Sequence, residues 1–442
     1  MNGRYIAAIE VSTSKIVAAI GKTRANGALD IIAVEQEPTP EGGVRYGIIQ
    51  NLEETFTSVA RLFARVEQRQ NVHPRKVKSV IVGLGGRSLK NITKEVSLSL
   101  PAETEINDEI LSRLQEQALH SAIDNTLEVV DAVPRVFIVG DSRTASPKGM
   151  VGDHISGIFD LIVCRPELKR NIRRTLVDKL HLEVDGFVVT AMATGHLILT
   201  PEEKRLGCMF VDMGAETTTV TIYQKGALHY FATLPMGGRN ISRDIASLGV
   251  VDAKAEEIKI TSGNALVEHD VPNLSINNLK LSDISNLVVA RSEEIVANII
   301  EQIEYAGIKD GDLQGGIICI GGGFRLKGMM ELLEMQSGIN VRRGTLPEYV
   351  KIEDTRCNGV ELAEVASVLY AGATLTDKES LVAPERSVMP QNGVLPLETE
   401  ENEKPQKTEP KKPKKSFFEK MGKKIGDLFN ASDEEDTDLL DE

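Results

Sequence analysis

Short apolar runs alternate with stretches of helical periodicity along the first 383 residues. The strand-like runs, rich in β-branched residues, are YIAAIEV (5–11), KIVAAIG (15–21), SVIVGL (79–84), MFVDM (209–213), TVTIY (219–223) and GIICIG (316–321). A helix is predicted around VARSEEIVANIIEQIEYAG (289–307), because apolar residues recur at helical spacing, at Val288, Val289, Ile295, Ile299 and Ile303. Strands that alternate with helices in this way predict an α/β fold.

Two of these runs open hairpins of similar design, about 200 residues apart. In YIAAIEVSTSKIVAAIGK (5–22) and CMFVDMGAETTTVTIYQK (208–225), a strand ends on an acid, Glu10 or Asp212. A turn of small and hydroxyl residues follows, and a second β-branched strand returns. The pattern indicates an internal duplication, although two unrelated hairpins with turn-compatible residues are an alternative.

The turns have the composition of a phosphate-binding site, because small residues leave backbone N–H groups exposed. The residues predicted to contact phosphate are Ser12, Thr13, Ser14 and Lys15 in the first turn and Gly214, Ala215, Glu216, Thr217 and Thr218 in the second. Mg²⁺ prefers oxygen ligands and keeps much of its water. Glu10 and Asp212 are therefore predicted to hold Mg²⁺ through water.

A third element is the glycine run in GGIICIGGGFRLKGMMELL (315–333). Gly321, Gly322, Gly323 and the adjacent Phe324 lie between a buried strand and a helix, where a base, ribose or phosphate can approach closely. The run is neither a P-loop nor a dinucleotide fingerprint, since Leu326 stands where the fingerprint has its third glycine.

The order hairpin, hairpin, glycine run resembles the actin-like ATPase superfamily, and four stretches resemble the bacterial cell-division FtsA family within it. They are LEVDGFVVTAMATGHLILTPEEKRLGCMFVDMG (182–214), LPMGGRNISRDIA (234–246), AKAEEIKITSG (253–263) and CIGGGFRLKG (319–328). The resemblance, over roughly residues 4–380, implies a two-lobed fold that binds ATP with Mg²⁺. It also implies that Glu256 and Lys259 contact ribose and adenine, and that Gly237 and Gly238 close the second phosphate loop.

Both loops depart from the family pattern. The first usually reads D-x-G-T. Here Glu10 replaces the aspartate and keeps a carboxylate, and Ser12 replaces the glycine. The second usually reads D-x-G-G-G-T, and here Ala215 and Glu216 replace two glycines. A carboxylate at Glu216 would repel a polyphosphate unless it turns away or binds metal. Thr219 stands where chaperone-like members have Asp, so slow or absent hydrolysis is expected.

The resemblance also divides the chain. The expected parts are a lobe I core (1–83, with 165–204 and 362–383), an inserted 1C-like α/β subdomain (84–164), a lobe II core (205–240 and 304–361), a small lobe II subdomain (241–303), a disordered linker (384–415), an amphipathic helix (416–430) and an acidic tail (431–442). In the family the insert contacts neighbouring subunits and other division proteins, and the small subdomain receives the C-terminal peptide of FtsZ. An accessory domain without a partner is the alternative for the insert.

Composition narrows the classes further. The formal net charge of −14 argues against nucleic-acid binding, which needs a basic face. No run approaches the roughly 20 apolar residues that span a bilayer, and MNGRYIAAIEVSTSK at the start lacks the pattern of a signal peptide. The cysteines at 164, 208, 319 and 357 are far apart and are expected to be reduced thiols in the cytoplasm.

The last residues contrast with the acidic body. Residues 384–415 are proline-rich and densely charged, which predicts a disordered linker. On a helix over 416–430, one apolar stripe forms from Phe417, Phe418, Met421, Ile425, Leu428 and Phe429, with Lys420, Lys423 and Lys424 beside it. This pattern suits a helix lying in the headgroup plane of an anionic membrane. A helix packed on the globular body, or in a partner's groove, is the alternative.

The leading interpretation is an actin-like, ATP-binding cell-division protein. By resemblance it polymerises and tethers the FtsZ ring to the cytoplasmic face of the cell membrane at the division site. A pilus-assembly adaptor of the PilM type and a small-molecule kinase on the same fold are the alternatives. A kinase would need a catalytic carboxylate in the cleft and no membrane-binding helix.

Overall fold

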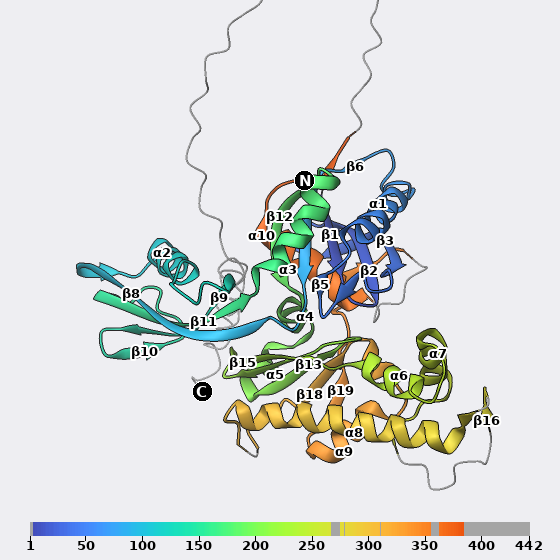
Figure 1. The fold of residues 1–442 in the computed structure, drawn as a ribbon. Coiled ribbons are helices and arrows are strands. Elements are labelled where there is room, and N and C mark those ends of the chain that lie inside the picture. Colours follow the sequence, from blue (N-terminus) through green and yellow to red (C-terminus); the bar gives the residue numbers. More distant parts are fainter. Residues whose placement is uncertain (1–2, 267–274, 278, 310, 355–361, 384–442) are drawn as a thin grey trace, which may run out of the picture.

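The computed structural model describes residues 3–266, 275–277, 279–309, 311–354 and 362–383, which form two lobes and an insert (Figure 1). The linker, the amphipathic helix and the acidic tail predicted over 384–442 lie outside the described residues. None of the helices in the described ranges is long and apolar enough to cross a membrane.

Lobe I contains a six-stranded sheet in the order β12–β7–β1–β2–β3–β20. Its strands are β1 (Tyr5–Val11), β2 (Lys15–Thr23), β3 (Leu29–Pro38), β7 (Ser79–Leu84), β12 (Glu183–Val189) and β20 (Val350–Ile352). Lobe II contains a five-stranded sheet in the order β15–β14–β13–β18–β19. Its strands are β13 (Cys208–Met213), β14 (Thr218–Gln224), β15 (Ala227–Leu234), β18 (Ile317–Ile320) and β19 (Val341–Arg343).

The two sheets repeat one topology, which confirms the duplication predicted from the hairpins. In lobe I, β1 pairs antiparallel with β2 and β2 with β3, while β7 and β12 extend the sheet in parallel on the other side. In lobe II, β13, β14 and β15 take the antiparallel places and β18 and β19 the parallel ones. The acid-ended strands β1 and β13 are therefore equivalent.

Helices pack on these two sheets and on the insert. They are α1 (Leu52–Glu67), α2 (Asp108–Leu119), α3 (Pro166–Arg173), α4 (Thr190–Ile198), α5 (Pro201–Leu206), α6 (Gly238–Ala246), α7 (Asp252–Ser262), α8 (Leu281–Tyr305), α9 (Met329–Ser337) and α10 (Ala363–Leu375). A π-helical turn η1 (Arg174–Lys179) and a 3-10 turn η2 (Gly322–Arg325) complete them. Short strand pairs are β4 (Val44–Arg45) with β5 (Ile48–Ile49), β6 (Lys76–Val77) with β21 (Leu381–Val382), and β16 (Ser275–Ile276) with β17 (Leu279–Lys280).

Strand β1 is apolar throughout because helices cover both faces of its sheet. Ile9 belongs to the core cluster that includes Leu62 of α1, whereas Ala8 belongs to the cluster that includes Leu369 of α10. Each of these side chains is fully buried. The central strand is thus fixed in register, which holds Glu10 at its end in one place.

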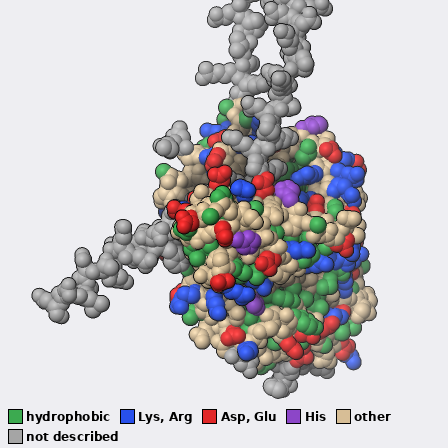
Figure 2. Space-filling model, turned by 90° about the vertical axis from the view of Figure 1, so that its left-hand side faces the viewer, with side chains coloured by type: hydrophobic (Ala, Val, Ile, Leu, Met, Phe, Trp, Pro, Cys, Tyr) green, Lys and Arg blue, Asp and Glu red, His purple; other side chains and the backbone are tan. Residues whose placement is uncertain are grey.

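The insert lies beside the lobes and has its own sheet, in the order β10–β9–β11–β8 (Figure 1). Its strands are β8 (Lys90–Glu105), β9 (Glu128–Val139), β10 (Ser142–Thr144) and β11 (Val151–Cys164). Helix α2 packs on this sheet through Ile110 and Leu114, which share a cluster with Phe159. On the side of the molecule where the insert lies, acidic and basic side chains are interspersed (Figure 2).

Arg135 connects the insert to lobe II. Arg135 of β9 contacts the fully buried carboxylate of Asp160 on β11 through two hydrogen bonds of 2.9 and 2.8 Å. The same guanidinium donates to the backbone carbonyl of His229 on β15 at 3.0 Å. The insert is therefore joined to lobe II by this hydrogen bond and by the packing of β15 against β8 and β9, although its chain connections run to β7 and α3 of lobe I.

Candidate functional site

A cavity of about 1260 Å³ contains the loops singled out in the sequence. The sequence-predicted residues that line it are Glu10, Ser12, Thr13, Ser14, Lys15, Asp212, Gly214, Ala215, Glu216, Thr217, Gly238, Glu256, Lys259, Gly322 and Gly323. Both lobes supply walls, since the first loop belongs to β1–β2 and the second to β13–β14.

The first loop is a tight turn between β1 and β2. The Ser12 N–H donates to the Lys15 carbonyl at 3.0 Å, and the Thr39 hydroxyl donates to the Ser12 carbonyl at 2.7 Å. Ser12 is not among the described residues with positive φ, so serine in place of glycine imposes no backbone strain. The Ser12 hydroxyl is buried and has no hydrogen-bond partner within the described residues.

The second loop is held by the start of α6. The Gly214 N–H donates to the Thr217 carbonyl at 2.8 Å, and the Gly238 N–H donates to the Gly214 carbonyl at 3.0 Å. A Cβ at Gly237 would lie 2.5 Å from the Gly214 carbonyl oxygen, so the close approach requires glycine. The predicted glycine pair therefore does contact this loop. Thr218 instead donates its hydroxyl to the Met236 carbonyl at 2.9 Å and does not line the cavity.

The three glycines after β18 differ in their surroundings. Gly321 has φ of +91°, and its Cβ would lie 2.4 Å from the Met213 carbonyl oxygen. A Cβ at Gly323 would lie 2.4 Å from Cγ of Met213, whereas one at Gly322 would meet nothing within 4 Å. Gly321 and Phe324 do not line the cavity, and Phe324 is buried in the lobe II core. Gly322 alone of the three opens onto free space.

Two carboxyl groups stand at equivalent strand ends. Burial, with the nearby Glu364 carboxylate, raises the pKa of Asp212 to about 8. The same two causes, burial first, raise the pKa of Glu10 well above its usual range. Burial alone would lower the pKa of Lys15, but Glu364, whose carboxylate lies 3.3 Å from Lys15 Nζ, leads the neighbouring acids in raising it.

The donor set fits an ion held partly by water. Glu10 is buried, and its Oε2 atom has no hydrogen-bond partner among the described residues. Within those residues, no three His, Cys, Asp or Glu side chains come together as direct metal ligands. A hydrated Mg²⁺ that also binds ligand oxygens needs only one or two carboxylates from the protein. Glu10 and Asp212 meet that requirement.

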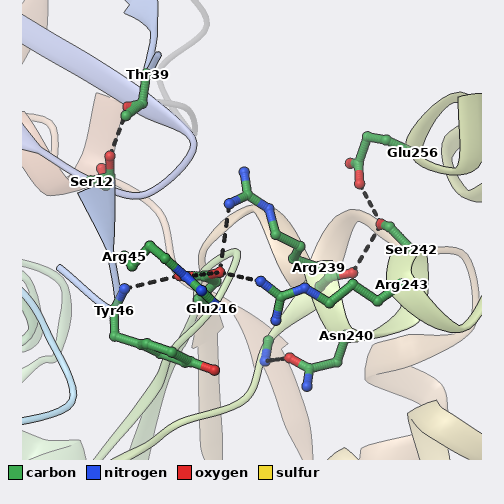
Figure 3. Close-up of polar contacts among 12 residues, drawn as sticks. Ser12, Thr39, Arg45, Tyr46, Glu216, Arg239, Asn240, Ser242, Arg243 and Glu256 are labelled. Atoms are coloured by element: carbon green, nitrogen blue, oxygen red, sulfur yellow. Dashed lines mark hydrogen bonds and ion pairs between the residues drawn. The ribbon is translucent and has the colours of Figure 1, made fainter. Parts of the chain in front are cut away.

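Helix α7 packs against α6 and lines one wall of the cavity. Lys259 donates to the Gly238 carbonyl at 3.1 Å and to the Glu256 carboxylate at 2.8 Å. Glu256 also accepts a hydrogen bond from the Ser242 hydroxyl (Figure 3). The two residues that the resemblance assigned to ribose and adenine thus lie together at the cavity wall, tied to α6.

Glu216 is surrounded by positive charge rather than facing the cavity as an unpaired anion (Figure 3). Its side chain is fully buried. One carboxylate oxygen faces Arg243, Arg239 at 3.6 Å and Arg45 at 3.9 Å. The other accepts the Tyr46 N–H at 2.9 Å. The repulsion considered for a bound polyphosphate is therefore offset by these arginines.

Sequence reasoning missed four of these residues. Glu364 looks like an ordinary acid in the first turn of a helix, and no local pattern places it beside Lys15. Arg239 and Arg243 follow the glycine pair at a spacing of one helical turn, which was a usable signal. Arg45 lies on a two-residue strand far away in sequence, so nothing local pointed to it.

Two family models match this chain. One, described as cell division protein FtsA, matches residues 209–366, and the other, an SHS2 domain inserted in FtsA, matches residues 86–163. Together they cover more than half of the chain. The chain belongs to the FtsA family. The match to the SHS2 domain falls on the insert, which is built from β8, α2, β9, β10 and β11.

Individual relatives agree with this assignment. Cell division protein FtsA of Pseudomonas aeruginosa is 25% identical over 393 residues, covering 86% of this chain and 92% of the relative. The FtsA of Bacillus subtilis is 27% identical over 379 residues, covering 83% and 84%. These matches favour FtsA over the pilus-assembly adaptor and the small-molecule kinase.

Solved structures bear on the fold alone. The PilM–PilN type IV pilus biogenesis complex superposes with a TM-score of 0.59 at 18% identity, over 83% of this chain and 97% of that one. The actin-like α/β fold with an inserted subdomain, predicted from the sequence, is confirmed by this likeness and by the SHS2 match.

Proposed function

We propose that this member of the FtsA family binds ATP with Mg²⁺ between its lobes, polymerises, and tethers the FtsZ ring to the cytoplasmic face of the cell membrane. One observation carries the nucleotide part of the proposal. Two equivalent strand-end turns and Gly322 open onto one cavity that also holds Glu10 and Asp212. A cavity of about 1260 Å³ has room for a nucleotide, because ligand pockets commonly measure about 300–1,000 Å³.

The proposal gives each part of the cavity a role. The backbone N–H groups of Thr13, Ser14 and Lys15 in the first turn, and of Ala215, Glu216 and Thr217 in the second, hold the phosphates, with Lys15 adding a positive charge. Gly322 leaves room for the nucleotide to approach η2, and Glu256 and Lys259 contact the ribose and the base. Mg²⁺, when bound, neutralises phosphate charge. Glu10 and Asp212 hold its water shell.

Hydrolysis is slow or absent in this proposal. The glycines that usually surround the terminal phosphate are replaced by Ser12, Ala215 and Glu216. Each adds side-chain atoms, and the Glu216 carboxylate is engaged with Arg239 and Arg243. The nucleotide would then act chiefly by setting the relation between the lobes.

The tethering part rests on the sequence of the C-terminal residues. The apolar stripe over 416–430 is proposed to insert into an anionic leaflet, where each nearby lysine contributes about 1 kcal/mol. The small lobe II subdomain is proposed to bind the C-terminal peptide of FtsZ, and the insert to contact other division proteins. Filament formation would strengthen membrane attachment through avidity.

The test is co-sedimentation of the full chain with anionic liposomes and FtsZ, in the presence of ATP. We expect FtsZ to sediment with the liposomes only when the full chain is present, and not with a chain that ends at residue 410. The proposal fails if the shortened chain brings FtsZ to the liposomes as well as the full chain does. A salt titration serves as a control, since electrostatic attachment weakens as salt rises.

A further inference from the structure

One contact joins the two lobes across the cavity (Figure 3). Glu216 lies in lobe II, in the turn between β13 and β14, whereas Arg45 and Tyr46 lie in lobe I at the end of β4. The Tyr46 N–H donates to Oε2 of Glu216 at 2.9 Å, and Nε of Arg45 lies 3.9 Å from Oε1. A single carboxylate thus binds two groups of the opposite lobe.

The lobe I side of this contact is held in one conformation. Tyr46 has φ of +49°, a left-handed value that non-glycine residues rarely adopt. Its ring lies beneath the Arg87 guanidinium at 4.5 Å, and its carbonyl accepts the Arg87 N–H at 3.2 Å. The next residue, Gly47, is packed so closely that a Cβ would lie 2.0 Å from the Gly85 carbonyl oxygen. The Tyr46 N–H is therefore presented to lobe II by a rigid segment.

The lobe II side is held by α6. Arg239 and Arg243 both face Oε1 of Glu216, and the carboxylate is fully removed from solvent. These two arginines compensate the buried charge within lobe II. They leave Oε2 for the Tyr46 N–H of lobe I. The loop is thus supported by its own lobe, while its second oxygen contacts the other.

We propose that Glu216 is an interlobe latch that limits nucleotide exchange. The inference rests on the proposed binding of nucleotide in the cavity, since the cavity walls come from both lobes. If the lobes must separate to release a nucleotide, the Tyr46 and Arg45 contacts must break first. Breaking them leaves a carboxylate oxygen without a partner, which adds to the barrier. Glycine, usual at this position in the family, has no side chain to form such a contact.

The kinetic test measures the dissociation of a fluorescent N-methylanthraniloyl-ADP from the full chain by stopped flow. Glu216→Gln replaces a charged acceptor by a neutral amide oxygen and so weakens the interlobe hydrogen bond, which should raise the dissociation rate by up to about tenfold. Arg45→Gln, which removes a group of lobe I only, should raise it by a smaller factor. Arg243→Gln leaves both interlobe contacts in place and should give no increase.

Glu202→Gln is the matched control, because Glu202 is an exposed glutamate paired with Arg205 of its own helix. The latch is excluded if Glu216→Gln and Arg45→Gln both dissociate at the wild-type rate. It is also excluded if Arg243→Gln accelerates dissociation as much as Arg45→Gln, since the arginines would then act by supporting the loop.

A second readout needs no nucleotide. Amide hydrogen exchange at Tyr46 in the ligand-free chain should be faster in Glu216→Gln than in the wild type and unchanged in Glu202→Gln. Equal exchange in wild type and Glu216→Gln would overturn the latch. If the exchange difference is present but the wild type binds no N-methylanthraniloyl-ADP, the nucleotide-binding proposal fails, and with it the role in exchange, while the interlobe contact stands.

Discussion

Gly321, Gly322 and Gly323 are consecutive, yet a side chain added at each would have a different effect. At Gly321 and Gly323 the new atoms would collide with Met213, so these glycines permit η2 to pack against β13. At Gly322 they would enter the cavity, where no protein atom lies within 4 Å. Gly321 and Gly323 are thus needed for packing, whereas Gly322 between them keeps the cavity open to a ligand.

Gly322→Val should therefore abolish ATP binding while the free energy of unfolding changes by less than about 1 kcal/mol. Gly323→Ala should instead lower the free energy of unfolding by about 1–3 kcal/mol, because Met213 is fully buried and must move. Isothermal titration with Mg-ATP and urea unfolding measure the two quantities. Wild-type affinity in Gly322→Val would contradict the assignment of the cavity.

Asp212 predicts a pH dependence of stability in the ligand-free protein. Burial raises its pKa to about 8. Between its unfolded pKa, about 3.9, and this value, the folded state holds a proton that the unfolded state lacks. The free energy of unfolding should fall as pH rises through this window and level off above pH 8. The Asp212 side chain lines the cavity, where solvent can screen its charge. The free energy of unfolding should therefore fall by less than the limit of about 1.4 kcal/mol per pH unit for one proton.

Asp212→Asn provides the comparison, since it keeps the shape of the side chain and removes its titration. Urea unfolding at pH 6 and pH 8 should show a smaller loss of stability in the variant than in the wild type. At pH 8 the variant should be the more stable of the two. Parallel pH profiles would show that Asp212 titrates normally.

Residue types at strand ends and turns were predictable because they are local. Glu10 and Asp212 end apolar runs, and glycine in a turn is visible without the fold. Glu364, Arg45 and Tyr46 were not predictable, because their partners are far away in sequence: 364 with 15, and 45 and 46 with 216. The orientation of the Glu216 side chain depends on those distant groups. The sequence alone therefore did not decide whether this carboxylate faces the cavity or turns away from it.

At the scale of elements, each lobe repeats one sheet that begins with a hairpin. Continuous apolar runs predicted six strands of these sheets, β1, β2 and β7 in lobe I and β13, β14 and β18 in lobe II. The helix around 289–307 is observed as α8 (Leu281–Tyr305), which begins earlier than the quoted stretch. The apolar positions Leu281, Ile284 and Val288 already follow helical spacing, and Ile284 and Val288 are buried, so the quoted stretch began too late. The pairing of β20 with β3 was not visible either, since these strands are about 300 residues apart.

The amphipathic helix predicted over 416–430 gives an element-scale test. Phe418→Glu or Ile425→Glu should release the chain from anionic liposomes, because burying such a side chain contributes roughly 1.5–3 kcal/mol. Lys423→Gln should only weaken attachment, and raised salt should have a similar effect. Co-sedimentation measures attachment, and nucleotide titration checks that the variants still bind ATP. Full sedimentation of Phe418→Glu would mean that the helix docks on protein.

For the whole molecule, the departures in both phosphate loops predict low turnover. Phosphate release with excess Mg-ATP should remain below the range of about 1–100 s⁻¹ that is typical of kinases. Adding small sugars should not increase it. Glu10→Gln shows whether any residual phosphate release comes from this cavity, because a rate that depends on Glu10 should fall in that variant. A rate within the kinase range with a sugar would revive the alternative of a small-molecule kinase.

The hydrogen bond from Arg135 to the His229 carbonyl has a mechanical consequence. The polypeptide enters and leaves the insert from lobe I, while the Arg135 guanidinium donates a hydrogen bond to the His229 carbonyl of lobe II. A subdomain that is covalently connected to lobe I and hydrogen-bonded to lobe II cannot keep both connections unchanged when the two lobes rotate relative to each other. When the lobes rotate, either the hydrogen bond to His229 breaks, or the whole insert moves with the lobes. In the second case the end of the insert near β10 moves farther than the part at His229.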